Sequence, residues 1–235
     1  MEARGMAMMD RFEMSDGLVL VPCARILNPR VFAIVPAYAD PACPVNGFGA
    51  LYRRDVTMLG EAGFLAAFDV AGRIYHEATG HRIRVLDCFR PVEAQQAMAA
   101  LRPDVPGHLL AVPGTGAHPR GMAIDIQPFG DAGDLDLGTP FDDFTESGQR
   151  QSDRAHDFAD VDPDRRAVIA ENRRALDAAV RAAAGETGVP LVGLPSEWWD
   201  YRLPAADYER YAPVSDAQLP PEWRYLSRDQ AAASG

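Results

Sequence analysis

An aspartate in the middle of an apolar run constrains this chain more than any other feature. Residues 122–129 have the composition of a buried strand, and Asp125 lies near the centre of the run. A carboxylate rarely lies in such a strand unless it is paired with a cation or bound to a metal. The run therefore predicts a core strand that carries a buried ion pair or a metal ligand.

A histidine precedes this run at a spacing that suits a shared site. Six residues separate His118 from Asp125, and Gly121 among them lets the chain turn from a loop into the strand. Imidazole and carboxylate are both zinc ligands, so the two side chains are candidates for one metal site. The alternative is a loop histidine and a strand aspartate that only cap a turn.

Two further stretches carry side chains of catalytic type. Residues 195–201 contain Glu197 and Asp200. In a regular strand these two would lie on opposite faces, whereas a twisted strand end or a bulge would bring them to one site. Residues 85–91 predict a strand that ends at Arg90, before a helix that begins with proline. For Glu197 and Arg90 the alternative role is a structural ion pair.

Together these stretches resemble the D-alanyl-D-alanine dipeptidases of the VanX type, within the wider group of zinc D,D-peptidases. The shared motifs are Phe-Arg-Pro at 89–91, Gly-Ala-His-Pro-Arg-Gly-Met-Ala-Ile-Asp at 116–125, Phe-Asp-Asp-Phe at 141–144 and Ser-Glu-Trp-Trp at 196–199. The resemblance covers roughly residues 30–205. It implies an α+β fold with a central, mainly antiparallel sheet flanked by helices. It also implies a metal-dependent dipeptidase whose substrate is a small dipeptide such as D-Ala-D-Ala.

The resemblance implies roles for individual side chains. Glu197 matches the general base, and Arg90 matches the group that stabilises the oxyanion. Asp142 matches the carboxylate that holds the free amino group of the substrate, and Tyr38 matches a tyrosine in a loop over the site. Gly116 stands in the substrate site where the family commonly has a serine. The alternative for Tyr38 is an ordinary packing role, and the alternative for Asp142 is one more surface aspartate.

The third metal ligand departs from the family pattern. The family has Glu-Trp-Trp-His, and this chain has Glu-Trp-Trp-Asp, so the implied ligands are His118, Asp125 and Asp200. Zinc is the expected cofactor, but a second carboxylate makes the site harder and more negative and brings manganese and iron(II) into consideration. Three outcomes stay open: a working dipeptidase, a repurposed metalloenzyme of a biosynthetic pathway, and a catalytically silent binding protein.

The acidic composition narrows the range of partners. The chain has 235 residues, a formal net charge of −11 and a pI of about 4.8. This charge argues against nucleic acid or an anionic membrane as the main partner. No apolar run reaches the ~18 residues of a membrane span, and the N-terminus lacks the pattern of a secretory signal. A homo-oligomer stays open.

Cysteine content indicates the compartment. Cys23, Cys43 and Cys88 lack metal-type spacing, and we expect free thiols in a reducing cytoplasm. A disulfide between Cys23 and Cys43 is the less favoured alternative.

Apolar periodicity and turn residues predict one domain with two extensions. We expect a loose leader at 1–15, a metallopeptidase-like domain at 16–205 and a C-terminal tail packed on the surface at 206–235. Helices are predicted over 59–79, 91–101 and 163–184. Strands are predicted over 18–21, 31–35 and 82–88, with Ile83, Val85 and Asp87 on one face of the last. The polar stretch 149–164 is expected to be a mobile excursion.

Overall fold

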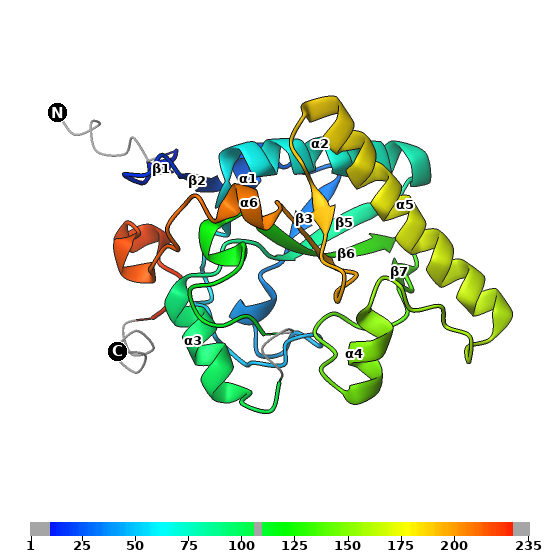
Figure 1. Ribbon diagram of the computed structural model, residues 1–235. Coiled ribbons are helices and arrows are strands. Elements are labelled where there is room, and N and C mark those ends of the chain that lie inside the picture. The colour runs from blue at the N-terminus through cyan, green and yellow to red at the C-terminus, as the bar shows by residue number, and fades with distance from the viewer. Residues whose placement is uncertain (1–9, 106–109, 228–235) are drawn as a thin grey trace.

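The computed structural model has a six-stranded mixed sheet between two groups of helices (Figure 1). It describes residues 10–105 and 110–227. The strands run in the order β3, β5, β6, β9, β8, and β7 pairs with the end of β6. Only the β3–β5 pair is parallel among the described strands of this sheet. The predicted α+β fold with a mainly antiparallel sheet is confirmed. The strands are β3 (Phe32–Ile34), β5 (Arg82–Asp87), β6 (Ala123–Gly130), β7 (Gly133–Asp134), β8 (Val192–Gly193) and β9 (Asp200–Arg202).

A smaller antiparallel sheet lies beside the first one. Its order is β1–β2–β4, with β1 at Phe12–Glu13, β2 at Val19–Pro22 and β4 at Leu59–Glu61. The predicted helix over 59–79 therefore begins later, because its first three residues pair with β2. The short helices are α1 (Cys23–Ile26), α6 (Ala205–Tyr208) and the 3-10 turns η1 (Ala37–Ala39), η2 (His118–Arg120), η3 (Asp216–Gln218) and η4 (Pro221–Trp223).

Helices α2 (Ala62–Thr79) and α5 (Pro163–Thr187) pack against each other and cover one face of the large sheet (Figure 1). Glu61 caps α2 by accepting a hydrogen bond from the Phe64 nitrogen, and Gly80 ends the helix in the left-handed conformation with φ of 74°. Apolar side chains that recur every three or four residues along α2 are buried: Leu65, Phe68, Ala71 and Tyr75. Helix α5 runs past the predicted end at residue 184 and stops at Gly188, which also has positive φ.

Helices α3 (Val92–Leu101) and α4 (Glu146–Ser152) lie on the opposite side of the sheet (Figure 1). The predicted mobile excursion 149–164 therefore begins inside a helix. Thr145 caps the first turn of helix α4, because its side chain accepts a hydrogen bond from the Gly148 nitrogen. Helix α3 begins after Pro91, because a proline needs no backbone hydrogen bond at a helix start. This second face holds the pocket described below.

The C-terminal segment contributes to the core. Tyr225 is fully buried, and its hydroxyl accepts a hydrogen bond of 2.6 Å from the Leu59 nitrogen. Its ring lies edge-on to Tyr52 at a centroid distance of 4.9 Å, and Trp223 is buried nearby in the chain. The boundary at residue 205 stays a prediction, and so does the leader, of which residues 1–9 lie outside the described residues.

The three cysteines are free. Cys23 and Cys88 are buried and Cys43 is partly buried, so the less favoured Cys23–Cys43 disulfide is absent from the described residues. Within residues 10–105 and 110–227, none of the helices combines the length and apolar character needed to cross a bilayer.

Gly121 joins the two sheets where no side chain fits. Its carbonyl oxygen accepts a hydrogen bond of 2.8 Å from the Glu61 nitrogen. Its φ is 65°, and a β-carbon there would lie 2.8 Å from the same nitrogen. The loop that carries His118 therefore reaches β4 only through a glycine.

We expect Gly121→Ala to lower the free energy of unfolding by about 3 kcal/mol, because backbone strain and overpacking add. Gly80→Ala is the matched control, since Gly80 also has positive φ but has open space where the β-carbon would lie. It should cost only about 1–2 kcal/mol. Denaturant unfolding of both variants measures the difference, and equal losses would contradict the steric part of the argument.

Candidate functional site

Strand register places three aspartates side by side. Asp125 on β6 lies opposite Asp87 on β5 and opposite Asp200 on β9. All three are buried, with at most 2% of each residue exposed. Because β6 is the middle strand, its carboxylate is the centre of the row. The neighbours Ile124 and Ile126 point to the other face, into the core beneath α2 and α5.

A bulge brings Asp87 into this row. The pairing of β5 with β6 shifts register between Val85 and Asp87. In a regular strand Asp87 would share the face of Val85, as the sequence alternation predicts. The extra residue, Leu86, re-aims the next side chain, so Asp87 faces the same side as Asp125.

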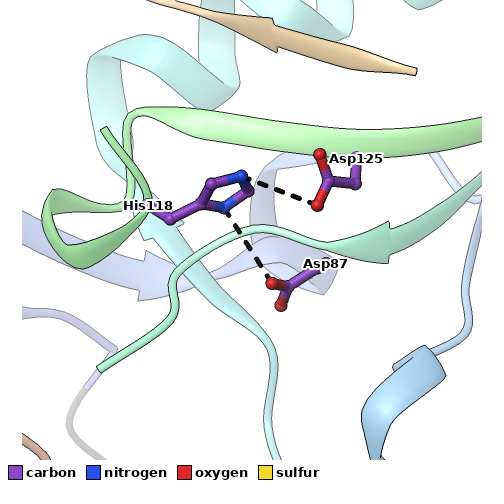
Figure 2. A group of neighbouring side chains, drawn as sticks. All are labelled: Asp87, His118 and Asp125. Carbon is purple, nitrogen blue, oxygen red and sulfur yellow. Dashed lines mark ion pairs between the residues drawn. The ribbon is translucent and has the colours of Figure 1, made fainter. Parts of the chain in front are cut away.

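His118 lies against two carboxylates of this row, those of Asp87 and Asp125 (Figure 2). Its Nδ1 donates to the Cys88 carbonyl oxygen at 2.6 Å. Its Nε2 faces Asp125 Oδ2 at 3.5 Å and Asp200 Oδ2 at 3.2 Å. Burial alone lowers the pKa of His118, but the carboxylates, Asp125 foremost, raise it to about 10. With one nitrogen committed to a carbonyl, Nε2 is the atom available to a proton or a metal.

Arg90 follows β5 and bonds to two of the aspartates, which share its single positive charge. Its Nε donates to Asp87 Oδ2 at 2.8 Å, and an Nη donates to Asp125 Oδ2 at 3.2 Å. Tyr52 donates to the remaining oxygen of Asp87 at 3.0 Å. The guanidinium also lies over the ring of Tyr38, 5.4 Å from its centroid. Arg90, the predicted stabiliser of the oxyanion, is therefore buried and held in place by Asp87 and Asp125.

Glu197 lies in a turn rather than in a strand. Strand β9 begins only at Asp200, and the Leu194 nitrogen donates to the Asp200 carbonyl to close the loop. Alternation along a strand therefore does not apply, and Glu197 and Asp200 reach the same pocket. Two buried tryptophans hold the turn: Trp198 donates to the Thr139 carbonyl at 3.2 Å, and Trp199 packs on Phe141.

The carboxyl groups of Glu197 and Asp200 differ in charge. Burial, followed by repulsion from Asp200, raises the pKa of Glu197 well above its ordinary value. Burial also acts to raise the pKa of Asp200, but the Arg202 guanidinium outweighs it and lowers that pKa below its ordinary value. The turn therefore carries one carboxyl group that holds a proton easily and one that stays ionised.

Asp142 and Tyr38 form a second polar group in the pocket. The Tyr38 hydroxyl donates to Asp142 Oδ2 at 2.6 Å. Asp142 has a φ of 54°, which is uncommon for a residue other than glycine and indicates a backbone held by its surroundings. Burial raises the pKa of Asp142 to about 7. The carboxyl group thus titrates near neutrality unless a cationic group reaches it.

One pocket gathers every residue singled out from the sequence. It has about 590 Å³ of empty space, part of it open to solvent. Its lining includes all eight predicted site residues: Tyr38, Arg90, Gly116, His118, Asp125, Asp142, Glu197 and Asp200. The eight residues therefore lie around one pocket. The role of each residue stays a prediction.

Sequence reasoning missed two arginines. Arg202 on β9 lines the pocket and donates through two nitrogens to both carboxylate oxygens of Asp200. The signal was available, because residues two apart on a strand share a face. Arg154 donates to the carbonyl oxygens of Leu194, Trp198 and Asp200, each at 2.9 Å, and so fixes the turn. It lies in the stretch expected to be mobile, and nothing in its local sequence predicts these contacts.

The donor set fits a divalent metal. Asp125 Oδ1 is buried and has no hydrogen-bond partner, which is costly unless another group binds it. Two atoms that share a tetrahedral zinc ion lie about 3.3 Å apart. The other oxygen of Asp125, Oδ2, lies 3.5 Å from His118 Nε2, and Asp200 Oδ2 lies 3.2 Å from it. Among the described residues, two groups have ligand atoms within 4.8 Å of one another: Asp87, His118 and Asp125, and Asp125, Glu197 and Asp200.

Comparison with known proteins decides the family. The family model described as D-Ala-D-Ala dipeptidase, Peptidase M15, matches residues 46–217. The chain belongs to this family of peptidases. A curated relative, the D-alanyl-D-alanine dipeptidase of Escherichia coli (strain K12), is 30% identical over 153 residues, which is 64% of this chain and 70% of the relative. The predicted family and the prediction of a hydrolase are confirmed.

A solved structure, that of the Serratia marcescens L-Ala D-Glu endopeptidase ChiX, also matches. The similarity covers 77% of this chain and 95% of that chain, with 17% identity and a TM-score of 0.38. This level of likeness is too low to bear on function.

We expect divalent-cation affinity to rise with pH by up to about tenfold per unit between pH 6 and 9. His118, with a pKa of about 10, is protonated in this range, and a cation that binds Nε2 must displace that proton. Glu197, whose pKa burial raises, acts in the same direction. Cation titrations at several pH values measure the slope, and a flat profile would remove His118 from the ligand set.

Proposed function

We propose that this protein is a divalent-metal-dependent dipeptidase that hydrolyses a small dipeptide such as D-Ala-D-Ala. The observation that carries the proposal is the meeting of two aspartates of the row, Asp125 and Asp200, with His118 and the buried Glu197 in one pocket. A further carboxyl group, that of the partly buried Asp142, lines the same pocket. Family membership supports peptide hydrolysis, and the name of the E. coli relative supports the choice of substrate.

His118 and Asp125 are the proposed principal ligands of the cation, with Asp200 as the third. The Nδ1 bond to the Cys88 carbonyl fixes the His118 ring so that Nε2 faces the pocket, where a cation would take the place of its proton. Asp125 offers the unpartnered Oδ1. A cation held there would supply Lewis-acid chemistry by polarising the scissile carbonyl. Zinc is the preferred ion, and manganese and iron(II) remain alternatives because two of the ligands are carboxylates.

Glu197 is the proposed general base. It takes a proton from the attacking water and passes it to the leaving amine. The repulsion that raises its pKa comes from neighbouring carboxylates, and a cation bound among them would offset that repulsion. Arg90 is the proposed stabiliser of the oxyanion, because its position is fixed by Asp87 and Asp125 before any substrate arrives.

Asp142 is the proposed anchor for the substrate's free amino group. An ammonium group beside it would lower its pKa from about 7 and keep the carboxylate ionised. Tyr38 orients one carboxylate oxygen and leaves the other for the substrate. Gly116, which has positive φ, lines the pocket with backbone where the family commonly has a serine. A fixed carboxylate of this kind selects peptides whose free amino group lies one residue before the scissile bond over N-blocked peptides.

We expect the wild-type protein to hydrolyse D-Ala-D-Ala only with a bound divalent cation, and Glu197→Gln to lower the rate by about 100-fold or more. The amide cannot accept the proton from water but keeps the shape of the side chain. Hydrolysis is measured with zinc, manganese and iron(II) in turn, and cation affinity by titration. Retained affinity with lost activity supports the role. A wild-type rate in the variant would exclude Glu197 as base. A wild-type protein that binds no divalent cation would contradict the proposed function.

We expect N-acetylation of the dipeptide, or Asp142→Asn, to lower kcat/KM by about 10- to 100-fold, since each removes the charge-assisted contact. The acetylated dipeptide should lose nothing further in the variant. Asp143→Asn is the matched control, because that neighbouring carboxylate bonds to Thr145 instead. Equal losses in both variants would show a structural effect on the loop rather than an amine anchor.

A further inference from the structure

Asp200 is held by an arginine of its own strand. Arg202 Nε donates to Asp200 Oδ1 at 2.7 Å, and Nη2 donates to Oδ2. The Asp200 side chain is fully buried, and 17% of the Arg202 side chain is exposed. Both residues line the pocket, and Asp200 Oδ2 also faces His118 Nε2 at 3.2 Å. The ion pair therefore lies at the proposed cation site and not at a distance from it.

We propose that Asp200 and Arg202 act as one unit, in which Arg202 cancels the charge of Asp200 and so sets the affinity and preference of the site for divalent cations. The inference rests on the proposed function, since it concerns the cation of that site. Arg202 is a positioning residue, because it acts through Asp200. The pair offers one carboxylate oxygen toward His118 with no net charge, as a neutral third ligand would.

The charge balance of the pocket supports this unit. When a cation takes the place of the His118 Nε2 proton, the imidazole is neutral. Asp125 and Asp200 then carry two negative charges, and Arg202 reduces this total to one. The sequence alone predicts a more negative site than one with two histidines, and the structure corrects that expectation through Arg202. Arg90 contributes less to this balance, because it also neutralises Asp87.

Competition gives the unit its second effect. The guanidinium binds both oxygens of Asp200, so a cation must share Oδ2 with Arg202. Two like charges separated by a few Å in a buried pocket repel strongly. Arg202 thus weakens binding while it fixes the direction of the carboxylate. We expect the repulsion to outweigh the loss of orientation when Arg202 is replaced.

The test is cation affinity, measured by competition with a chromophoric chelator, with zinc and manganese as probes and no activity assay. We expect Arg202→Met to bind manganese at least about tenfold more tightly than wild type, and zinc with a smaller gain. Arg202→Lys keeps the charge and should bind within a few-fold of wild type. Arg84→Met is the matched control, because Arg84 pairs with Asp134 and does not line the pocket.

Thermal unfolding supplies a second readout. Arg202→Met leaves a buried carboxylate without its partner, so we expect a lower Tm without cation and a larger rise on adding manganese than in wild type. A variant that folds only with cation present would show the same effect in a stronger form. An unchanged rise on adding manganese would contradict the inference.

A histidine at position 200 tests the pair from the other side. We expect Asp200→His with Arg202→Met to bind zinc at least about tenfold more tightly than Asp200→His alone, where Arg202 is left without its carboxylate. Equal zinc affinity in these two variants, or equal manganese affinity in Arg202→Met and wild type, would overturn the inference. A wild type that binds no cation while Arg202→Met binds one would contradict the proposed function and uphold the inference.

Discussion

Three carboxylates buried side by side are the constraint on which the rest of this structure depends. Asp87, Asp125 and Asp200 lie in register across adjacent strands, and burial of uncompensated charge is prohibitively costly. Arg90 serves the first two and Arg202 the third. Loss of one partner from such a buried pair typically costs about 3–5 kcal/mol. Keeping these acidic groups together costs the chain free energy of unfolding, which indicates a functional site rather than a core built for stability alone.

The surrounding elements keep this charged row rigid. Tyr52 bonds to Asp87, the Cys88 carbonyl holds the His118 ring, and Arg154 ties together the turn that carries Glu197. Each of these supports comes from a different part of the chain. Helices α2 and α5 cover the far face of the sheet (Figure 1). The apolar side chains of the same strands are buried there. A hydrolytic site needs such fixed groups, because donors that reorganise during the reaction lose their electrostatic advantage.

The sequence predicts regular elements and the residues of the pocket well. Helix α2, its left-handed end at Gly80 and the strand around Asp125 follow from periodicity and turn chemistry. Prediction from the sequence fails where one extra residue in a strand, or a partner far along the chain, decides where a side chain points. The bulge at Leu86 re-aims Asp87, and no local pattern announces it. Arg154 bonds to carbonyl oxygens 40 to 46 residues further along the chain, beyond helix α5, and such contacts become visible only in the folded chain.

The burial of Tyr225 has a consequence for where this folding unit ends. The family match stops at residue 217, yet Tyr225 packs on Tyr52, which in turn holds Asp87. On the other side, Tyr38 and strand β3 precede the first matched residue. A fragment trimmed to residues 46–217, which the family model matches, would lose Tyr38 from the pocket lining and Tyr225 from the support beneath it. The stretch that the family model matches is therefore shorter than the stretch that builds and supports the pocket.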